Sequence, residues 1–153
     1  MQPPKSLENV ALFGLGEAGT LIAIDLQKAG ISVTAYDPKD IPTPAGVDRV
    51  HTPQEAVATA DVIIGLTAGD DAITAIDQAI TAIPSTALYA DFSTNSAAAK
   101  LAMAERAVDH GFDFVDVALM TVVPGNGLRT PVTVSGSGAK RFEQLFAPVE
   151  MRI

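Results

Sequence analysis

Three glycines at fixed spacing near the N-terminus place the strongest constraint on how this chain can fold. Residues 14–19 read Gly-Leu-Gly-Glu-Ala-Gly, a G-x-G-x-x-G pattern. The apolar run from Asn9 to Phe13 precedes it, and apolar residues at helical spacing follow from Glu17 to Ala29. A second run rich in β-branched and aromatic residues, Ile31 to Asp37, comes next. A strand, a glycine turn and a helix leading to another strand predict a parallel βαβ unit.

The rest of the chain repeats this alternation of strands and helices. Further strands are predicted over 61–67, 86–92, 112–118 and 131–135, with a short extended stretch over 47–51. Helices are predicted over 53–60, 70–83, 96–110 and 138–146. In the helix over 96–110, we expect the inward face to carry Ala97, Leu101, Ala104 and Val108. The pattern predicts an α/β fold of the doubly wound Rossmann type, a mostly parallel sheet with helices on both faces.

Length and composition fit one domain over residues 1–153. With 48% hydrophobic and 18% charged residues, the chain can bury a core without disulfides or metals. Residues 149–153 begin a fresh apolar run at the C-terminus. We interpret this as a cut, and expect a helical catalytic and dimerisation domain to be absent from this chain.

Charge and residue usage exclude several classes of function. The net charge is −8, and no cluster of Lys and Arg is present, which argues against nucleic acid and anionic membranes as partners. The chain has no cysteine and two isolated histidines, His51 and His110, so no metal site is expected. No signal peptide or 18-residue apolar run is visible, so a cytoplasmic location is the default expectation.

The glycine pattern itself suggests a dinucleotide site. Gly14 is expected to make the tight turn, Gly16 to let the backbone approach a pyrophosphate, and Gly19 to allow close packing of helix on strand. Free amides at the helix start would then hold the phosphates with help from the helix dipole. The expected cofactor contacts in this loop are Gly14, Leu15, Gly16, Glu17, Ala18 and Gly19.

Asp37 ends the second predicted strand at about the spacing expected of a ribose-binding acid. A carboxylate there accepts hydrogen bonds from the adenosine ribose and repels a 2′-phosphate, so NAD is favoured over NADP. Lys39 and Arg49 lie nearby in the sequence and keep NADP open. The alternative is that the glycines serve only a turn and that Asp37 is a solvated loop residue.

Five segments together resemble the N-terminal domain of the β-hydroxyacid dehydrogenase family, which includes 6-phosphogluconate and 3-hydroxyisobutyrate dehydrogenases. They are VALFGLGEAGT, ADVIIGLTAGDDA, LYADFSTNSAAAK, GFDFVDVALM and TPVTVSGSGAKRF. The turn from Asp91 to Thr94 and the stretch from Thr130 to Gly138 are the more specific parts. The resemblance implies an NAD(P)-dependent oxidoreductase that acts on a small hydroxyacid and forms a homodimer in its full-length form.

The resemblance also implies roles for individual residues. Thr67 and Ala68 would line the ribose and pyrophosphate region of the cofactor, and Thr94 would lie beside the nicotinamide ribose. Ser93 and Asn95 would lie next to the substrate. The alternative for this segment is helix capping by Asn95 or Ser96, which such residues do well.

Two departures from the family pattern limit the prediction of substrate and catalysis. Where relatives carry a Ser-Gly-Gly loop after the position of Asp116, this chain has residues 119–122, Leu-Met-Thr-Val, so Thr121 is the candidate substrate contact. The family's acid–base lysine falls beyond the end of this chain, so no catalytic residue is predicted. Lys100 is interpreted as solvated surface, and so are Lys140 and Arg141.

Two functions are therefore carried forward. The first is the cofactor-binding half of an oxidoreductase, in which the nicotinamide accepts a hydride from a small hydroxyacid. The second is a nucleotide-binding or redox-sensing module without catalytic activity, which would use the same glycine loop and Asp37.

Overall fold

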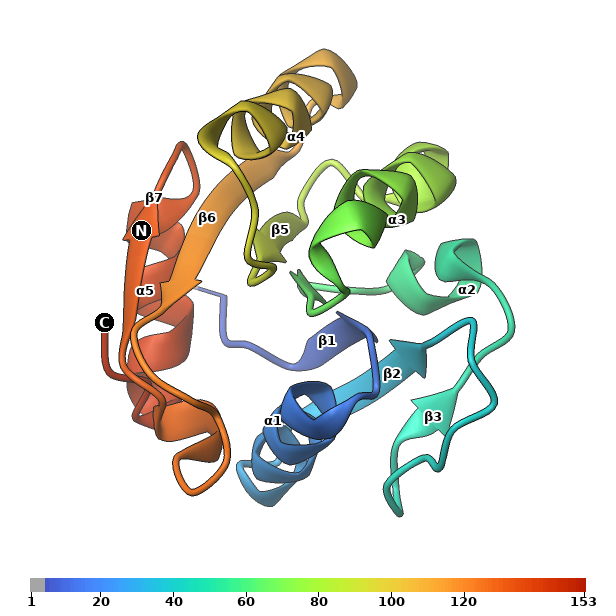
Figure 1. The fold of residues 1–153 in the computed structure, drawn as a ribbon, viewed down its shortest axis with the longest axis vertical. Helices are drawn as coiled ribbons and strands as arrows, with labels where there is room; N and C mark the ends of the chain where they lie inside the picture. The colour runs from blue at the N-terminus through green and yellow to red at the C-terminus, as the bar shows by residue number, and fades with distance from the viewer. Residues whose placement is uncertain (1–4) are drawn as a thin grey trace.

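A seven-stranded sheet lies between two layers of helices in the computed structural model, which describes residues 5–153 (Figure 1). The strands are β1 Asn9–Phe13, β2 Ser32–Tyr36, β3 Asp48–Arg49, β4 Val62–Gly65, β5 Leu88–Asp91, β6 Asp113–Leu119 and β7 Val132–Ser135. The helices are α1 Glu17–Lys28, α2 Pro53–Val57, α3 Ala72–Ala79, α4 Ala97–His110 and α5 Ala139–Phe146. Most of these elements agree with the sequence prediction to within two residues at each end, which confirms the predicted alternation.

The strand order is β3-β2-β1-β4-β5-β6-β7. Every neighbouring pair is parallel except β6 and β7, which are antiparallel. The direction of winding reverses between β1 and β4, as in doubly wound folds, and ligands of such sheets bind at the carboxyl ends of the strands beside that point. The predicted α/β, Rossmann-type fold with a mostly parallel sheet is confirmed.

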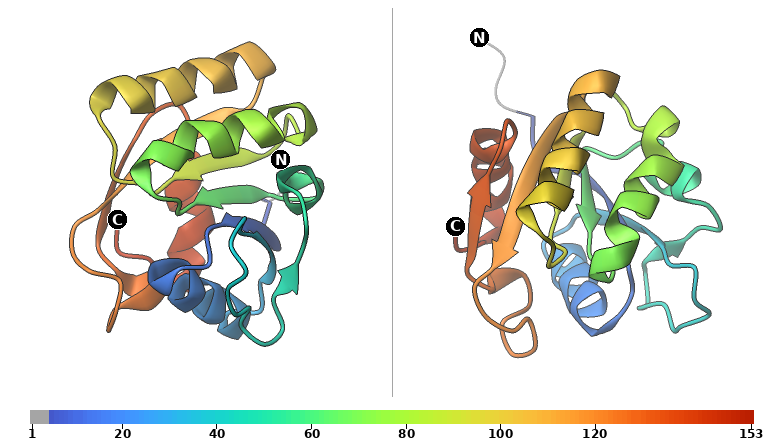
Figure 2. Two further views of the ribbon diagram at one scale, coloured as in Figure 1. Left: turned by 45° about the vertical axis from the view of Figure 1, so that its right-hand side comes forward. Right: turned by 45° about the horizontal axis from the view of Figure 1, so that its top comes forward.

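Two hydrophobic clusters cover the two faces of the sheet. On one face, α1 and α5 contribute Ile22, Leu26, Phe142 and Phe146 to the core. On the other face, α2, α3 and α4 contribute Val57, Ile76, Met103 and Ala107. Figure 2 shows α3 and α4 side by side on this second face. The alternation of side chains along each strand supplies both clusters, as expected of a sheet covered on both sides.

The predicted inward face of α4 is wrong. Leu101 is 65% exposed and Val108 is 76% exposed, whereas the helix buries Lys100, Met103 and Ala107. Ala97 is also exposed, and Ala104 is only partly buried. The physical reason is that an alanine-rich helix has little apolar contrast between its faces, so tertiary contacts decide its rotation about its own axis.

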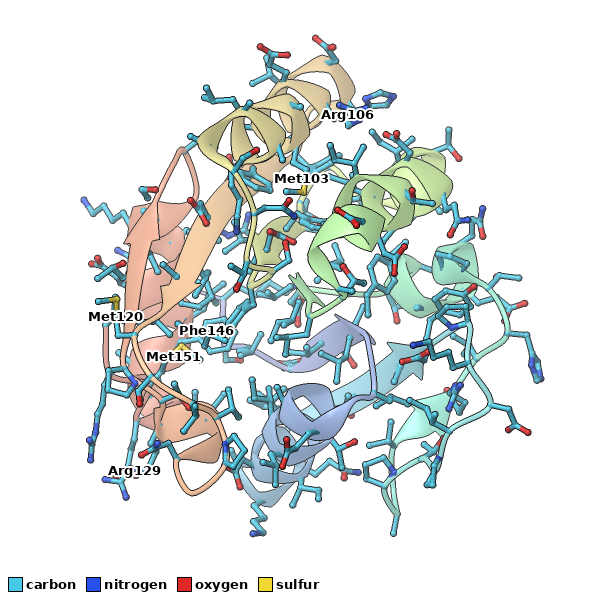
Figure 3. The ribbon with its side chains drawn as sticks, viewed as in Figure 1. Met103, Arg106, Met120, Arg129, Phe146 and Met151 are labelled. Atoms are coloured by element: carbon cyan, nitrogen blue, oxygen red, sulfur yellow. The ribbon has the colours of Figure 1, made fainter. Side chains whose placement is uncertain are left out.

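The C-terminal segment packs against this same domain. Met151 is buried, and Figure 3 shows it beside Phe146. The amide of Val132 in β7 donates to the carbonyl of Arg152 at 2.8 Å. The loop between β6 and β7 contacts α1, where the carboxylate of Asp25 accepts from the amide of Leu128 at 2.9 Å. Within residues 149–153, Met151 is therefore part of the core and the backbone of Arg152 extends the sheet edge, whereas Ile153 is exposed.

Candidate dinucleotide site

Gly14 makes the turn between β1 and α1 in a conformation that favours glycine. Its φ is +101°, and its amide donates to the carbonyl of Tyr36 at 3.0 Å. A Cβ added at Gly14 would collide with the backbone carbonyl of Leu66. A Cβ added at Gly19 would collide with the carbonyl oxygen of Gly14. These two glycines therefore allow α1 to pack closely on the ends of β1 and β4.

Gly16 differs from its two neighbours in the motif because it faces open space. A Cβ built on it would meet no atom within 4 Å. Gly16 is the N-cap of α1, and no side chain caps this helix. The amides of Glu17 and Ala18 have no acceptor within residues 5–153. The start of α1 therefore presents free backbone donors and the positive end of the helix dipole to an anion.

The carboxylate of Asp37 is held beside the glycine turn. Its Oδ2 accepts from the amide of Leu15 at 2.8 Å, and its Oδ1 accepts from the amide of Lys39 at 2.9 Å. An ionised carboxylate has about four acceptor positions, so each oxygen keeps capacity for a further donor. Asp37 thus orders the glycine turn and can still accept from a ligand hydroxyl.

A pocket of about 430 Å³ opens at this point of the sheet edge. It brings together five of the predicted cofactor contacts: Gly14, Gly16, Asp37, Thr67 and Ala68. Lys39, considered in the sequence analysis only as a cation that could favour NADP, also lines it. The other lining residues were not predicted as cofactor contacts and are Phe13, Tyr36, Pro38, Ile41, Leu66, Asp71, Thr74, Ala75 and Gln78. Most of these follow strand ends or begin α3, so their place after β1, β2 and β4 is the signal that could have found them.

Arg49 supports the loop that follows Asp37. Its guanidinium donates to the carbonyls of Asp37 at 2.9 Å, Lys39 at 2.7 Å and Ile41 at 3.1 Å. It also donates to the hydroxyl of Thr43 at 3.0 Å. These contacts engage both terminal nitrogens of Arg49 with the loop, so this side chain shapes the wall of the pocket.

The loop after β5 carries the predicted nicotinamide-side residues, which lie outside this pocket. Thr94 is exposed, and Ser93 is buried, where its hydroxyl donates to Asp91 Oδ2 at 2.6 Å. The side-chain amide of Asn95 donates to Ser93 Oγ at 3.0 Å and to the carbonyl of Gly69 at 2.8 Å. Ser96 caps α4 by accepting from the amide of Ala99, as the capping alternative expected.

The interpretation of Lys100 as solvated surface is wrong. Only 11% of its side chain is exposed, and its ammonium lies 2.7 Å from Asp91 Oδ2 and 2.7 Å from Asp116 Oδ1. It also donates to the carbonyl of Asp91 at 3.1 Å. The two carboxylates, Asp91 at the end of β5 and Asp116 in the middle of β6, draw the long side chain inward, because a buried charge needs partners. These three acceptors use all three ammonium protons.

The same interpretation is correct for Lys140, which is exposed, and wrong for Arg141. Arg141 is half-buried, pairs with Asp113 at 3.3 Å and donates to the carbonyl of Thr86. It therefore ties α5 to β6 and to the turn before β5.

Asp91 is the most deeply buried acid in the site region. Burial raises its pKa, while hydrogen bonds from Lys100 and Ser93 act in the opposite direction and the charge of Asp116 adds to the rise. Its Oδ1 has no hydrogen-bond partner within the described residues. Thr67 Oγ1 is likewise buried without a partner among residues 5–153. The carboxyl edge of β4 and β5 therefore holds two polar atoms whose hydrogen-bonding capacity is unused.

Thr121 lies in the exposed segment after β6 and does not line the pocket, so its substrate contact stays a prediction. Residues 5–153 contain no group of three or more His, Cys, Asp or Glu side chains that could hold a metal ion. Within the same residues, no helix has the length and apolar character needed to span a membrane.

The fold matches several solved structures at low sequence identity. A conserved protein from Sinorhizobium meliloti matches with a TM-score of 0.86 at 22% identity, over 97% of this chain and 54% of the other. The 3-hydroxyisobutyrate dehydrogenase of Mycobacterium tuberculosis, solved with L-serine, matches with a TM-score of 0.81 at 25% identity, over 96% and 54%. This chain thus spans about half the length of these structures.

A variant of the imine reductase from Myxococcus stipitatus in complex with NAD⁺ matches with a TM-score of 0.81 at 17% identity, over 95% of this chain and 53% of that one. The same enzyme has also been solved with NADP⁺. A comparison with curated proteins gives no match. The model of the NAD-binding domain of 6-phosphogluconate dehydrogenase matches residues 9–142, which include the glycine turn, Asp37 and the loop after β5. The chain therefore belongs to the family of NAD-binding domains of 6-phosphogluconate dehydrogenase.

Proposed function

We propose that this chain binds NAD as the cofactor half of an oxidoreductase that oxidises a small hydroxyacid by hydride transfer. The observation that carries the proposal is that Gly16 and Asp37 face one pocket. The pocket offers backbone donors on one side and a carboxylate on the other. A pyrophosphate and an adenosine ribose need this pair of environments at this separation along a βαβ unit.

The residues around Gly16 fit the phosphates of a dinucleotide. The open space above Gly16 is the volume that a Cβ would fill in any other residue, and the free amides of Glu17 and Ala18 begin α1 beside it. Backbone amides bind phosphate without basic side chains. This explains how a chain with a net charge of −8 can hold an anionic cofactor.

Two features favour NAD over NADP. The carboxylate of Asp37 accepts from the ribose hydroxyls of NAD and repels the 2′-phosphate of NADP. Arg49, the nearby residue best suited to pair with that phosphate, is engaged by three carbonyls and a hydroxyl of the loop. Among residues 5–153, Lys39 is the one lysine or arginine that lines the pocket, and it could favour NADP.

The nicotinamide half is assigned to the ends of β4, β5 and β6, because each half of a doubly wound sheet holds one mononucleotide. Thr94 is an exposed residue of the loop after β5 and lies beside the nicotinamide ribose in this proposal. Ser93, Asn95 and Thr121 are the proposed substrate-side residues. A small hydroxyacid is the proposed substrate class because the relative from M. tuberculosis at 25% identity was solved with L-serine, which carries a β-hydroxyl.

The proton-transfer group of such a reaction is not assigned to this chain. Lys100 is the one lysine that reaches the carboxyl edge of β5 and β6 within residues 5–153, and its three protons are all donated. Bound nicotinamide supplies the hydride acceptor, whereas this chain supplies binding and orientation. The same observation favours the second function, a nucleotide-binding or redox-sensing module.

Two measurements separate these functions. We expect residues 1–153 to bind NAD in titration calorimetry and to form no NADH with a panel of small β-hydroxyacids. Formation of NADH by this chain alone would contradict the assignment of proton transfer elsewhere. If a longer polypeptide that contains this domain forms NADH with one of these β-hydroxyacids, the oxidoreductase function is supported. If it forms none, the nucleotide-binding or redox-sensing module is supported.

The ribose contact is tested by replacing the acid. We expect Asp37→Ala to weaken NAD binding at least about tenfold, since a charge-assisted hydrogen bond contributes about 1.5–3 kcal/mol. NADP binding should fall less, because the repulsion of its 2′-phosphate is removed as well. Asp40→Ala is the matched control, since Asp40 is an exposed acid of the same loop. Unchanged NAD binding in Asp37→Ala would show that the ribose assignment is wrong.

A further inference from the structure

Lys100, in the helix α4 that follows the loop carrying Thr94, connects the end of β5 to the middle of β6. We propose that Lys100 is a positioning residue for the nicotinamide half of the site, because its ion pairs with Asp91 and Asp116 fix the loop over residues 92–96. The inference rests on the proposed function, since it concerns where the second half of a dinucleotide binds.

The base of this arrangement is a pair of acids on neighbouring strands. Asp91 and Asp116 are direct register partners in the parallel pair β5 and β6. Two carboxylates in such positions repel each other, most strongly where water is excluded. The ammonium of Lys100 lies 2.7 Å from an oxygen of each and so ties the end of β5 and the middle of β6 to α4.

The upper part of the arrangement runs from Asp91 into the loop. Asp91 Oδ2, which pairs with Lys100, also accepts from the hydroxyl of Ser93 at 2.6 Å. Asn95 donates to Ser93 Oγ at 3.0 Å and to the carbonyl of Gly69 at 2.8 Å. A continuous set of polar contacts thus joins Lys100 to the segment that follows β4.

These contacts cross the carboxyl ends of β4 and β5 and reach the middle of β6, and these three strands form the second mononucleotide half of a doubly wound sheet. Thr94 is exposed between two residues that the contacts hold, Ser93 and Asn95. Lys100 donates all three of its ammonium protons to Asp91 and Asp116, and its side chain is largely buried. Its effect on a ligand is therefore indirect, through the loop.

The adenine half lies apart from this arrangement. None of Asp91, Ser93, Asn95, Lys100 and Asp116 lines the pocket beside Asp37. ADP carries the adenosine and pyrophosphate that this pocket is proposed to hold, and NAD adds the nicotinamide riboside. The ratio of the Kd for ADP to the Kd for NAD therefore measures what the nicotinamide half contributes.

The test compares Lys100→Met with wild type by titration calorimetry with ADP and with NAD. We expect the ADP affinity to stay within about twofold and the ratio to fall about tenfold, the effect of one or two misplaced hydrogen bonds. Lys140→Met is the matched control, because Lys140 is exposed on α5, on the opposite face of the sheet. That variant should keep the wild-type ratio.

A second variant addresses folding, because removing one partner of a buried ion pair leaves unpaired charge. Lys100→Met combined with Asp91→Asn restores the charge balance but lacks the ammonium that joins β5 to β6. We expect this double variant to bind ADP normally and still to show the lowered ratio. A return to the wild-type ratio would mean that buried charge alone causes the effect, and would overturn the proposal.

The remaining outcomes also decide the matter. If wild type binds ADP and NAD equally well, the nicotinamide half makes no contribution, and the inference fails while the adenine site stands. If neither Lys100 variant binds ADP, the contacts support the whole fold and not one half of the site. If wild type binds neither nucleotide, the proposed function fails, and the inference fails with it.

Discussion

Around β1, β2 and β4 the carboxyl edge of the sheet has a pocket, and we call this part the open region. Around β5 and β6, buried ion pairs of Lys100 join the two strands, and we call this part the closed region. The open region has a pocket of about 430 Å³, with Gly16 and the uncapped start of α1 at its side. The closed region has Lys100 between two carboxylates and a loop above it in which Thr94 is exposed. One sheet edge thus carries two kinds of surface.

The two regions depend on their residues in different ways. In the open region, backbone amides are the main donors to a ligand, so the lack of side chains at the glycines is what the site most requires. In the closed region, the loop depends on charges that lie beneath it and do not contact a ligand. Substitutions should therefore disturb the first region by steric conflict and the second by unpaired polar groups.

The largest effect among the stability predictions is expected for Gly14→Ala in the open region. A residue with a Cβ is strained at a φ of +101°, and the added atom would collide with the carbonyl of Leu66. We expect the free energy of unfolding to fall by about 2–4 kcal/mol. Urea unfolding followed by circular dichroism measures this change.

Gly16→Ala is the control for that experiment, since the two glycines are two residues apart in the same turn. The φ of Gly16 is −65°, and a Cβ added there would meet no atom of residues 5–153 within 4 Å. The unfolding free energy should change by no more than about 0.5 kcal/mol, while NAD binding weakens because the Cβ enters the pocket. Equal losses of stability in both variants would contradict the distinction between a packing glycine and a ligand-facing glycine.

The open region was largely predictable from the sequence because its signals are local. The apolar run of β1, the glycine spacing and the position of Asp37 all lie within one βαβ unit. The strands β4, β5 and β6 were also visible, since each is a short apolar run bounded by polar or turn residues. Local patterns did not identify the further residues that complete the pocket, such as Tyr36 at the end of β2 and Thr74 in α3.

The closed region was not predictable, because its contacts join residues far apart in the chain. Lys100 pairs with Asp116 on the next strand, and the sequence around Lys100 contains no pattern that predicts this partner. The prediction of which face of α4 points inward was wrong for a related reason, because tertiary contacts decide it. Alanines occupy both faces of this helix, so the prediction of its inward face depended on Leu101 and Val108. In the structure these two residues are exposed, and the buried face carries Lys100 and Met103. The pairing of this buried lysine with an aspartate in the middle of β6 can be inferred only once the register of β5 and β6 is known.

A smaller effect is expected in the closed region for Ser96→Ala. The hydroxyl of Ser96 accepts from the amide of Ala99 at the start of α4, and loss of such a cap costs about 1 kcal/mol. Thr94→Ala is the control, because Thr94 is exposed and belongs to the same loop. Thermal unfolding should show a lower Tm for Ser96→Ala alone. An equal decrease in both variants would indicate that the loop, and not the cap, sets the stability of α4.

The smallest effect is expected in the pH dependence of stability, and it separates the carboxyl edge from the amino edge of the sheet. Burial raises the pKa of Asp91. The native protein therefore binds this proton at a pH where the unfolded chain, with a carboxyl pKa near about 3.9, has lost it. The stability that Asp91 contributes is full below the unfolded pKa and is lost as the pH rises through the folded value. The difference in unfolding free energy between wild type and Asp91→Asn should consequently fall as the pH rises from about 3 to about 7.

Asp61 should show the opposite sign. Burial works against it, but hydrogen bonds from Lys5 and from the amides of Asn9 and Glu8 lower the pKa of Asp61 at the amino edge of the sheet. Its contribution is present above the unfolded pKa and is lost as the pH falls through the folded value. The difference between wild type and Asp61→Asn should therefore rise with pH over the range in which the Asp91 difference falls. If the two differences in unfolding free energy change with pH in the same direction, Lys100 compensates the charge of Asp91 as fully as the amides compensate that of Asp61. The closed region then carries no excess of buried negative charge.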